Sequence, residues 1–135
     1  DTGLVEPGEF TRDSGLAAGR RLLSRADRPT AILAQNDDMA VGAIQAIKEA
    51  GLKPGTDIKV VSIDAVPDIF LAMEAGEANA TVELTPNMAA PAFDALDAYW
   101  KNKTEPAKFI QTESKLYTQA DDPQAVYDSK KDLGY

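Results

Sequence analysis

The sequence contains no cysteine and no histidine. These two absences exclude disulfides, thiolate nucleophiles, imidazole bases and zinc sites of the usual kind. Any chemistry must therefore come from carboxylates, amides, hydroxyls and cationic side chains. A chain without cysteine is compatible with oxidising and reducing compartments alike, so this absence does not indicate a cellular location.

Positive charge and long apolar runs are also scarce. The 14 Lys and Arg residues face 22 Asp and Glu, which gives a net charge of −8, and no basic stripe could follow a phosphate backbone. No segment approaches the roughly 20 apolar residues of a membrane span, and the polar start "DTGLVEPGEF" does not resemble a signal peptide. What is present is 44% hydrophobic residues in 135, enough for the core of one domain. The chain is expected to be soluble, and its acidic charge balance makes nucleic acid an unexpected partner.

The apolar pattern predicts alternating strands and helices. "TAILAQ" is typical of a strand buried on both faces, and "DIKVVSID" and "ANATVEL" repeat the strand signal. Helical spacing follows in "FTRDSGLAAGRRLLSRA", capped by Thr11 or Asp13, and in the segment from Asp37 to a C-capping Gly51. "VPDIFLAMEAG" and "TPNMAAPAFDALDAYWK" predict two further helices. This alternation indicates an α/β fold with a mostly parallel sheet.

The last third of the chain has a different character. "KFIQTESKLYT" reads as an extended segment, and "DDPQAVYDSKKDLGY" as a charged tail with one or two helical turns.

Polar side chains stand where the predicted strands end. Asn36 follows the first strand, Asp64 ends the second, and Glu83 lies near the end of the third. Ligands of open α/β sheets bind at this carboxyl edge. An amide and carboxylates there suit a polyhydroxylated ligand such as a sugar, and Phe10 could cover the C–H face of its ring.

Each of these residues also has a purely structural interpretation. Asp37 and Asp38 are expected to cap the helix that begins there and to interact with its positive end, rather than to contact a ligand. Asn36 could equally be a turn residue, and Asp64 could cap the next helix.

The remaining candidates are open in the same way. Glu83 alternates with Val82 and Leu84, so its side chain could face the opposite side of the sheet. Arg12 lies in a first helical turn, where a salt bridge is at least as plausible as a ligand contact. Phe10 could be a hydrophobic staple.

The blocks "AILAQNDDMAVGAIQAIKEAGLKPG" and "DIKVVSIDAVPDIFLAMEAGEANATVELTP" resemble the C-terminal lobe of periplasmic sugar-binding proteins of the ribose/galactose type. The galactofuranose-binding branch is the most similar part of that family. The resemblance implies a three-layer α/β sandwich of the type I periplasmic-binding-protein fold, in which two lobes close on a sugar by hinge motion. It also implies that Asn36 and Asp64 hydrogen-bond the sugar and that Phe10 stacks on it, with Arg12 of the same block as a further candidate. Glu83 remains a candidate ligand residue because of its place near the end of the third strand.

Two departures from the family pattern accompany the resemblance. Many ribose-type members carry Gln near the end of the third strand, where this chain has Glu83 or Leu84. Members of the family are also about twice as long. The resemblance therefore implies a sugar-binding lobe at 1–84 without its first strand, a segment at 85–110 that crosses to an N-terminal lobe, and a return crossing with a tail at 111–135.

In that family the helix at 86–101 packs against the other lobe. Its apolar residues Met88, Phe93, Leu96 and Trp100 are therefore expected to be exposed, repacked or paired with another chain, and domain exchange is a hypothesis.

The expected function is reversible capture of a monosaccharide and its delivery to the permease of an ABC importer, in the periplasm, without catalysis, cofactor or metal. The alternative is the effector lobe of a LacI-type transcriptional repressor. Those repressors usually end the second strand in "GFDD", whereas this chain has "SIDAVPD". A third interpretation, an enzyme with Asp37, Asp38 and Asp64 as metal-binding or acid-base carboxylates, lacks a nucleophile or phosphate-binding motif.

Overall fold

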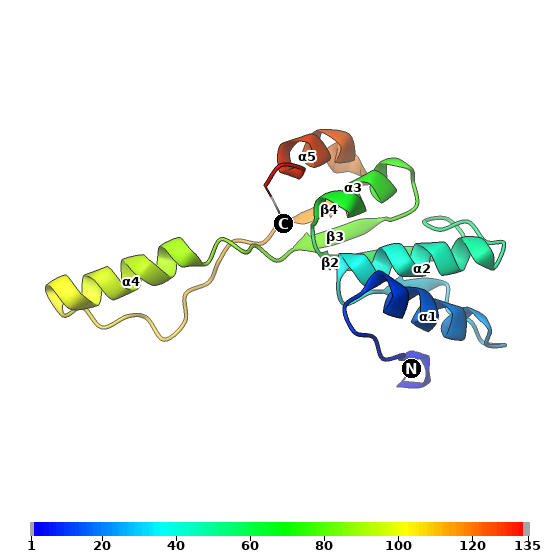
Figure 1. Cartoon of the computed structure of the whole chain (residues 1–135), viewed down its shortest axis with the longest axis horizontal. Helices are drawn as coiled ribbons and strands as arrows, with labels where there is room; N and C mark the ends of the chain where they lie inside the picture. Colours follow the sequence, from blue (N-terminus) through cyan, green and yellow to red (C-terminus); the bar gives the residue numbers. More distant parts are fainter. Residues whose placement is uncertain (1, 134–135) are drawn as a thin grey trace.

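The computed structural model describes residues 2–133 (Figure 1). Two short 3-10 helices are present, η1 (Thr2–Leu4) and η2 (Gln119–Asp121). The α-helices are α1 (Arg12–Leu23), α2 (Asp37–Glu49), α3 (Pro67–Glu74), α4 (Ala89–Asn102) and α5 (Pro123–Lys130). The strands are β1 (Ala31–Leu33), β2 (Lys59–Asp64), β3 (Ala80–Glu83) and β4 (Leu116–Thr118). The alternation predicted from the sequence is confirmed.

The sheet has the order β1-β2-β3-β4. The first three strands are parallel, and β4 is antiparallel to β3, with Thr81 opposite Tyr117. The mostly parallel α/β sheet is therefore confirmed. The short helical turns expected in the tail form η2 and α5, and α5 packs on α3.

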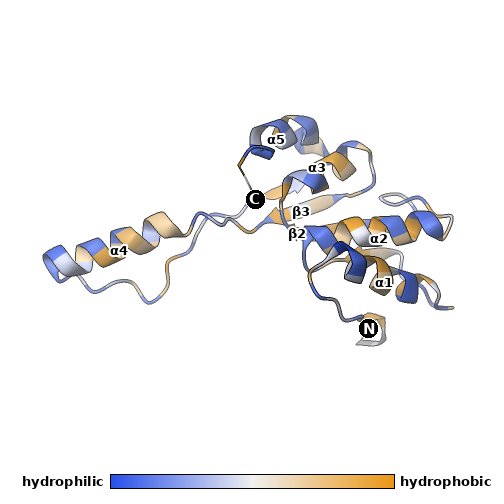
Figure 2. Ribbon diagram, viewed as in Figure 1, coloured by the Kyte–Doolittle hydropathy of each residue, from blue (hydrophilic) through white to orange (hydrophobic). Residues whose placement is uncertain are grey.

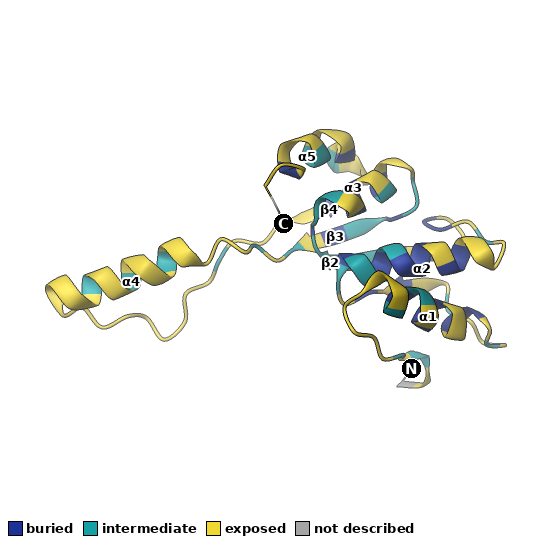
Figure 3. Ribbon diagram, in the orientation of Figure 1, coloured by how far each residue is buried: buried dark blue, intermediate teal, exposed yellow. Residues whose placement is uncertain are grey.

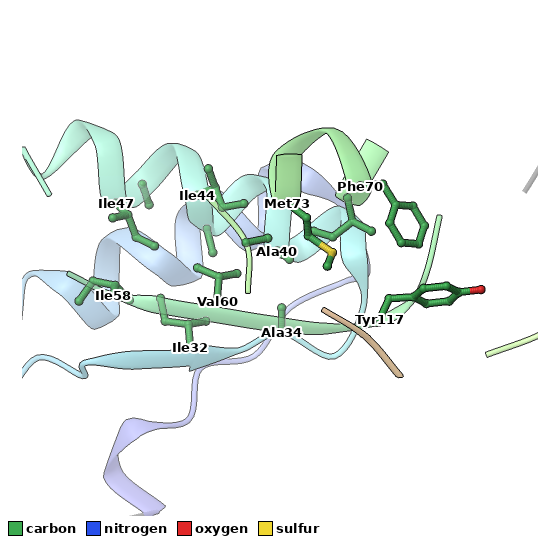
Figure 4. Packing of buried hydrophobic residues seen from close by; sticks show 14 of the residues in the cluster. Ile32, Ala34, Ala40, Ile44, Ile47, Ile58, Val60, Phe70, Met73 and Tyr117 are labelled. Atoms are coloured by element: carbon green, nitrogen blue, oxygen red, sulfur yellow. The ribbon is translucent and has the colours of Figure 1, made fainter. Parts of the chain in front are cut away.

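The core lies between the sheet and the helices (Figure 4). Every second strand residue points into it, among them Ile32, Val60 and Tyr117, because strand side chains alternate between faces. Phe70 of α3 meets the Tyr117 ring edge-on at a centroid distance of 5.1 Å. This contact fixes β4, and with it the C-terminal part of the chain, to the first three strands.

The other face of the sheet is open in residues 2–133. Leu33, Val82 and Leu116 are exposed there, and only one residue of β1, Ile32, is buried. The prediction that the "TAILAQ" strand is buried on both faces is therefore wrong for the described residues. The helices supply one covering layer, over the Ile32 side of the sheet.

Helix α4 extends away from the rest of the molecule (Figures 1 and 3). It has no buried residue, although the orange stretches of its ribbon in Figure 2 mark hydrophobic residues. Phe93 and Trp100 are 69% and 66% exposed. The exposure expected for this helix is confirmed. None of the helices in residues 2–133 is long and apolar enough to cross a membrane.

Candidate functional site

The first element of the site is the turn before α1. Phe10 has a left-handed φ of 59° and its side chain is 66% exposed, so it does not form the hydrophobic staple considered above. Thr11 caps α1 by accepting a hydrogen bond from the Ser14 N–H, as predicted. Helix α1 approaches α2 so closely that a Cβ at Gly42 would overlap the Arg12 carbonyl. The aromatic ring is thus presented to solvent from a tightly fixed turn.

Asn36 connects this turn to α2. Its Oδ1 accepts a hydrogen bond from the Met39 N–H at 3.0 Å, and its Nδ2 donates to the Phe10 carbonyl at 3.2 Å. Asn36 is therefore the N-cap of α2. One N–H of its amide and one lone pair of Oδ1 are left for a ligand.

The capping role predicted for Asp37 and Asp38 is wrong in detail. Asp37 is fully buried and its carboxylate is directed toward the strands, while Asp38 pairs with Arg12. The cap is Asn36 because its extended backbone, at φ −150° and ψ 168°, aims its side chain back at the first turn. Both aspartates still lie in that turn, where negative charge is favourable.

Asp64 ends β2 in an unusual backbone conformation. Its φ is 118° and that of Ala65 is 63°, both in the region that non-glycine residues avoid. The Asp64 side chain is half-buried and forms no hydrogen bond or ion pair with residues 2–133. Burial raises its pKa, and the negative charge of Asp38 raises it further. Asp64 is thus a carboxylate with its acceptor positions open at the carboxyl edge of the sheet.

Behind this turn lies a network that the sequence did not reveal. The Asp37 carboxylate accepts hydrogen bonds from Ser62 Oγ at 2.5 Å, from Thr81 Oγ1 at 2.9 Å and from the Val66 N–H at 2.8 Å. Burial raises the pKa of Asp37, although these hydrogen bonds act in the opposite direction. Ser62 and Thr81 lie 25 and 44 residues from Asp37. No local sequence signal links them.

Arg12 joins the N-termini of three helices. Its Nε contacts Asp38 of α2 at 2.8 Å and its second guanidinium nitrogen contacts Asp68 of α3 at 2.5 Å. The salt bridge considered from the sequence is therefore present. Its side chain is still about half exposed. Because α2 and α3 begin just after β1 and β2 end, the contacts with Asp38 and Asp68 place the guanidinium at the carboxyl edge of the sheet, where Asp64 ends β2.

Glu83 is held by the C-terminal part of the chain. Its Oε1 forms an ion pair with Lys130 Nζ of α5 at 2.6 Å, and the Tyr117 hydroxyl lies 3.5 Å from its Oε2. The two charged side chains are only 19% and 8% exposed. Glu83 points toward α5 and is already engaged. This arrangement favours a structural role over the ligand contact expected from its position near the end of the third strand.

The edge that carries these residues is an open surface. A hollow of about 540 Å³ lies beside β1 and α1, and none of the five candidates lines it. No group of three acidic side chains in the described residues is arranged to hold a metal ion. Phe10, Asn36 and Asp64 together offer an apolar ring, an amide and an open carboxylate, the groups that bind a sugar ring.

Comparison with known proteins gives a consistent match. The family model "Periplasmic binding protein-like domain" matches residues 3–120. The galactofuranose-binding protein YtfQ of Escherichia coli (strain K12) is 52% identical over 133 residues, which are 96% of this chain and 42% of that protein.

A solved structure agrees in fold. It is the periplasmic binding component of the arabinose ABC transporter from Shewanella sp. ANA-3, bound to α- and β-L-arabinofuranose, with a TM-score of 0.86 and 48% identity. The match covers 95% of this chain and 43% of that one. A transcriptional repressor, PurR of Edwardsiella ictaluri, is 38% identical over 84% of this chain and 32% of its own length. The chain thus spans less than half the length of each of these relatives.

Proposed function

The chain belongs to the periplasmic binding protein-like family, and from this premise we propose that it forms the C-terminal half of a monosaccharide site in an ABC importer. The observation that carries the proposal is Asp64. A half-buried carboxylate without a hydrogen-bond partner in residues 2–133, held on a strained turn, is suited to accept two neighbouring hydroxyl protons of a sugar.

The other residues complete the recognition of the ring. Asn36 lies beside the Phe10 turn and keeps one amide N–H for a hydroxyl oxygen. The exposed Phe10 ring provides the apolar plate. Arg12, fixed by two carboxylates, lies close enough to the edge to be a further donor. Furanose forms are the first candidates, because relatives of 48% and 52% identity carry galactofuranose or arabinofuranose in their names.

The wider role follows from the same membership. We assign the protein to the periplasm, with the membrane permease of the importer as its partner and no chemical reaction of its own. Residues 1–84 would form the sugar-binding lobe, 85–110 would cross to an N-terminal lobe, and 111–135 would return. In the structure β4 and α5 rejoin the lobe and α4 does not, which supports this division.

We further propose that α4 is covered by an N-terminal lobe. Its unburied apolar face includes Trp100, the single tryptophan of the sequence. In the complete product of the gene, Trp100 fluorescence, isolated by difference from Trp100→Phe, should be blue-shifted and shielded from quenchers. Solvent-like emission would contradict the proposal. A blue shift in the 135-residue chain that grows with concentration would instead indicate self-association or domain exchange through 86–101.

The function itself is tested by calorimetric titration of the complete gene product with aldopentoses and aldohexoses, furanose forms included. One sugar should bind at micromolar concentration or tighter, and Asp64→Ala should weaken it about 10- to 100-fold. Asp38→Ala is the control, because Asp68 still holds Arg12 in that variant, and its affinity should be nearly unchanged. Equal losses in the two variants would contradict the roles assigned here. Binding of operator DNA with no sugar affinity would favour a repressor.

A further inference from the structure

Asp37 is a buried acid that neither helix capping nor the sugar site explains. The cap of α2 is already supplied by Asn36, and Asp37 has no exposed surface. Burying a carboxylate is unfavourable unless hydrogen bonds compensate for the lost water. Asp37 receives three of them, from side chains of β2 and β3 and from the backbone of the loop between β2 and α3.

These hydrogen bonds converge on the turn that carries Asp64. The two residues after Asp64 each donate a backbone N–H into the network. Ala65 donates to Thr81 Oγ1 at 3.3 Å, and Val66 donates to the Asp37 carboxylate at 2.8 Å. Thr81 in turn donates to Asp37. Both amides that follow Asp64 are therefore anchored, directly or through one hydroxyl, to a single buried side chain.

The hydrogen bonds to Asp37 hold the backbone at a strained turn. Asp64 and Ala65 have φ values of 118° and 63° without being glycine. Such conformations persist only where the surrounding structure holds them in place. Without Asp37, the turn would be free to relax toward an extended backbone, and the Asp64 side chain would change direction.

We propose that Asp37 is a positioning residue for ligand binding, which holds the Asp64 carboxylate in its binding direction by fixing the Asp64-Ala65 turn. The inference rests on the proposed function, because it assumes that Asp64 contacts the ligand. It assigns the buried member of the "NDD" sequence a role distinct from those of Asn36, which caps α2, and Asp38, which pairs with Arg12.

Two readouts in the complete gene product test it. The first needs no ligand: the three-bond HN–Hα coupling constants of Asp64 and Ala65 report φ. In Asp37→Ala they should move from values of positive φ toward those of an extended chain. Native couplings in a folded Asp37→Ala would overturn the proposal.

The second readout is a double-mutant cycle on sugar affinity. Asp37→Ala should weaken binding about tenfold in the wild-type background and have almost no effect in the Asp64→Ala background. Equal losses in both backgrounds would show that Asp37 acts on the fold as a whole, and would overturn the proposal. If Asp64→Ala alone left affinity unchanged, the proposed function would fail, while the coupling constants would still decide the geometric part.

Three further variants separate positioning from general destabilisation. Asp37→Asn should retain most of the affinity, because its carbonyl can still accept from Val66 while the hydroxyls of Ser62 and Thr81 rotate to accept from its amide. Thr81→Val keeps the shape of the side chain and removes the hydroxyl that accepts the Ala65 N–H. If Asp37→Ala does not fold, the coupling constants and sugar affinity of Thr81→Val test the proposal instead, with the same expected changes. Asn79→Ala is the matched control.

Asn79 is suitable because its side chain hydrogen-bonds Val60 N and Gly55 O at the opposite end of the sheet. Asn79→Ala should lower stability and leave both affinity and the Asp64 couplings unchanged. If it weakened sugar binding as much as Asp37→Ala does, the special role of Asp37 would be refuted.

Discussion

The side-chain amide of Asn36 donates a hydrogen bond to the backbone carbonyl of Phe10 at 3.2 Å, across 26 residues of sequence. The same side chain caps α2. The contact fixes the turn before α1 to the start of α2, so that an aromatic ring and an amide share one edge of the sheet. Asn36 therefore contributes both to stability and to the proposed ligand site, and substitution can separate the two contributions.

Asn36→Ser should separate them. Serine caps a helix about as well as asparagine, and water can replace the lost amide at the exposed Phe10 carbonyl, so the free energy of unfolding should stay within about 0.5 kcal/mol of wild type. The lost amide should weaken sugar binding about three- to tenfold. Asn36→Ala should show the same affinity loss and lower stability by about 1 kcal/mol as well. Chemical denaturation and calorimetric titration measure the two effects, and unchanged affinity in Asn36→Ser would remove Asn36 from the site.

Phe10→Ala should affect binding and leave folding intact. The ring is 66% exposed, so its removal should change the free energy of unfolding by no more than about 0.5 kcal/mol. Loss of the apolar plate should cost about 1 kcal/mol of binding free energy, roughly fivefold in Kd. Phe10→Trp, which keeps a plate, should bind more tightly than the alanine variant. Equal affinities of the two variants would refute stacking.

Sugar affinity should depend on pH through Asp64. Its pKa is raised, first by burial and then by the charge of Asp38, so the carboxylate becomes protonated at a higher pH than an ordinary aspartate. A protonated carboxyl loses its charge-assisted hydrogen bonds. Affinity should therefore be full above this pKa and decline as the pH falls through it.

Asp38→Asn removes the negative charge that helps to raise the pKa of Asp64, so the loss of sugar affinity should begin at a lower pH than in wild type. Asp128→Asn, on the surface of α5, should leave the onset of this loss unchanged. Titrations at a series of pH values measure the shift, and an identical profile in Asp38→Asn and wild type would be inconsistent with Asp64 as the titrating group.

The Glu83–Lys130 pair should be a stability element. Glu83→Ala removes a mostly buried, charge-assisted contact of 2.6 Å to the Lys130 ammonium, and the free energy of unfolding should fall by about 2 kcal/mol. Glu49→Ala, which breaks the exposed pair with Arg20, is the matched control and should change it far less. Urea denaturation distinguishes them; equal small losses would mean that α5 does not depend on this ion pair.

The elements were predictable because their signals are local. Apolar spacing and Gly51 define α2, and Pro67 and Gly76 bracket α3. The positions of Asn36 and Asp64 at one sheet edge followed from the rule that parallel strands present their carboxyl ends together.

The partners of the side chains were not predictable, because they depend on contacts between distant segments. Three adjacent polar residues at a helix start offer three candidate caps, and the burial of Asp37 depends on hydroxyls from β2 and β3. In the sequence Glu83 has the position of a carboxylate at the sheet edge, and its ion pair with Lys130, 47 residues later, forms only in the folded chain. The exposed face of the sheet could likewise not be predicted from "TAILAQ", because the composition of this strand suits burial on both sides.

The most direct test is the crystal structure of the complete gene product with the sugar that binds in titration. The decisive measurement is the distance from the Asp64 carboxylate oxygens to the nearest sugar hydroxyl oxygens. We expect about 2.5–3.0 Å, with the Phe10 ring against the C–H face of the sugar. A sugar bound elsewhere, with Asp64 and Asn36 facing only water, would contradict the proposed site.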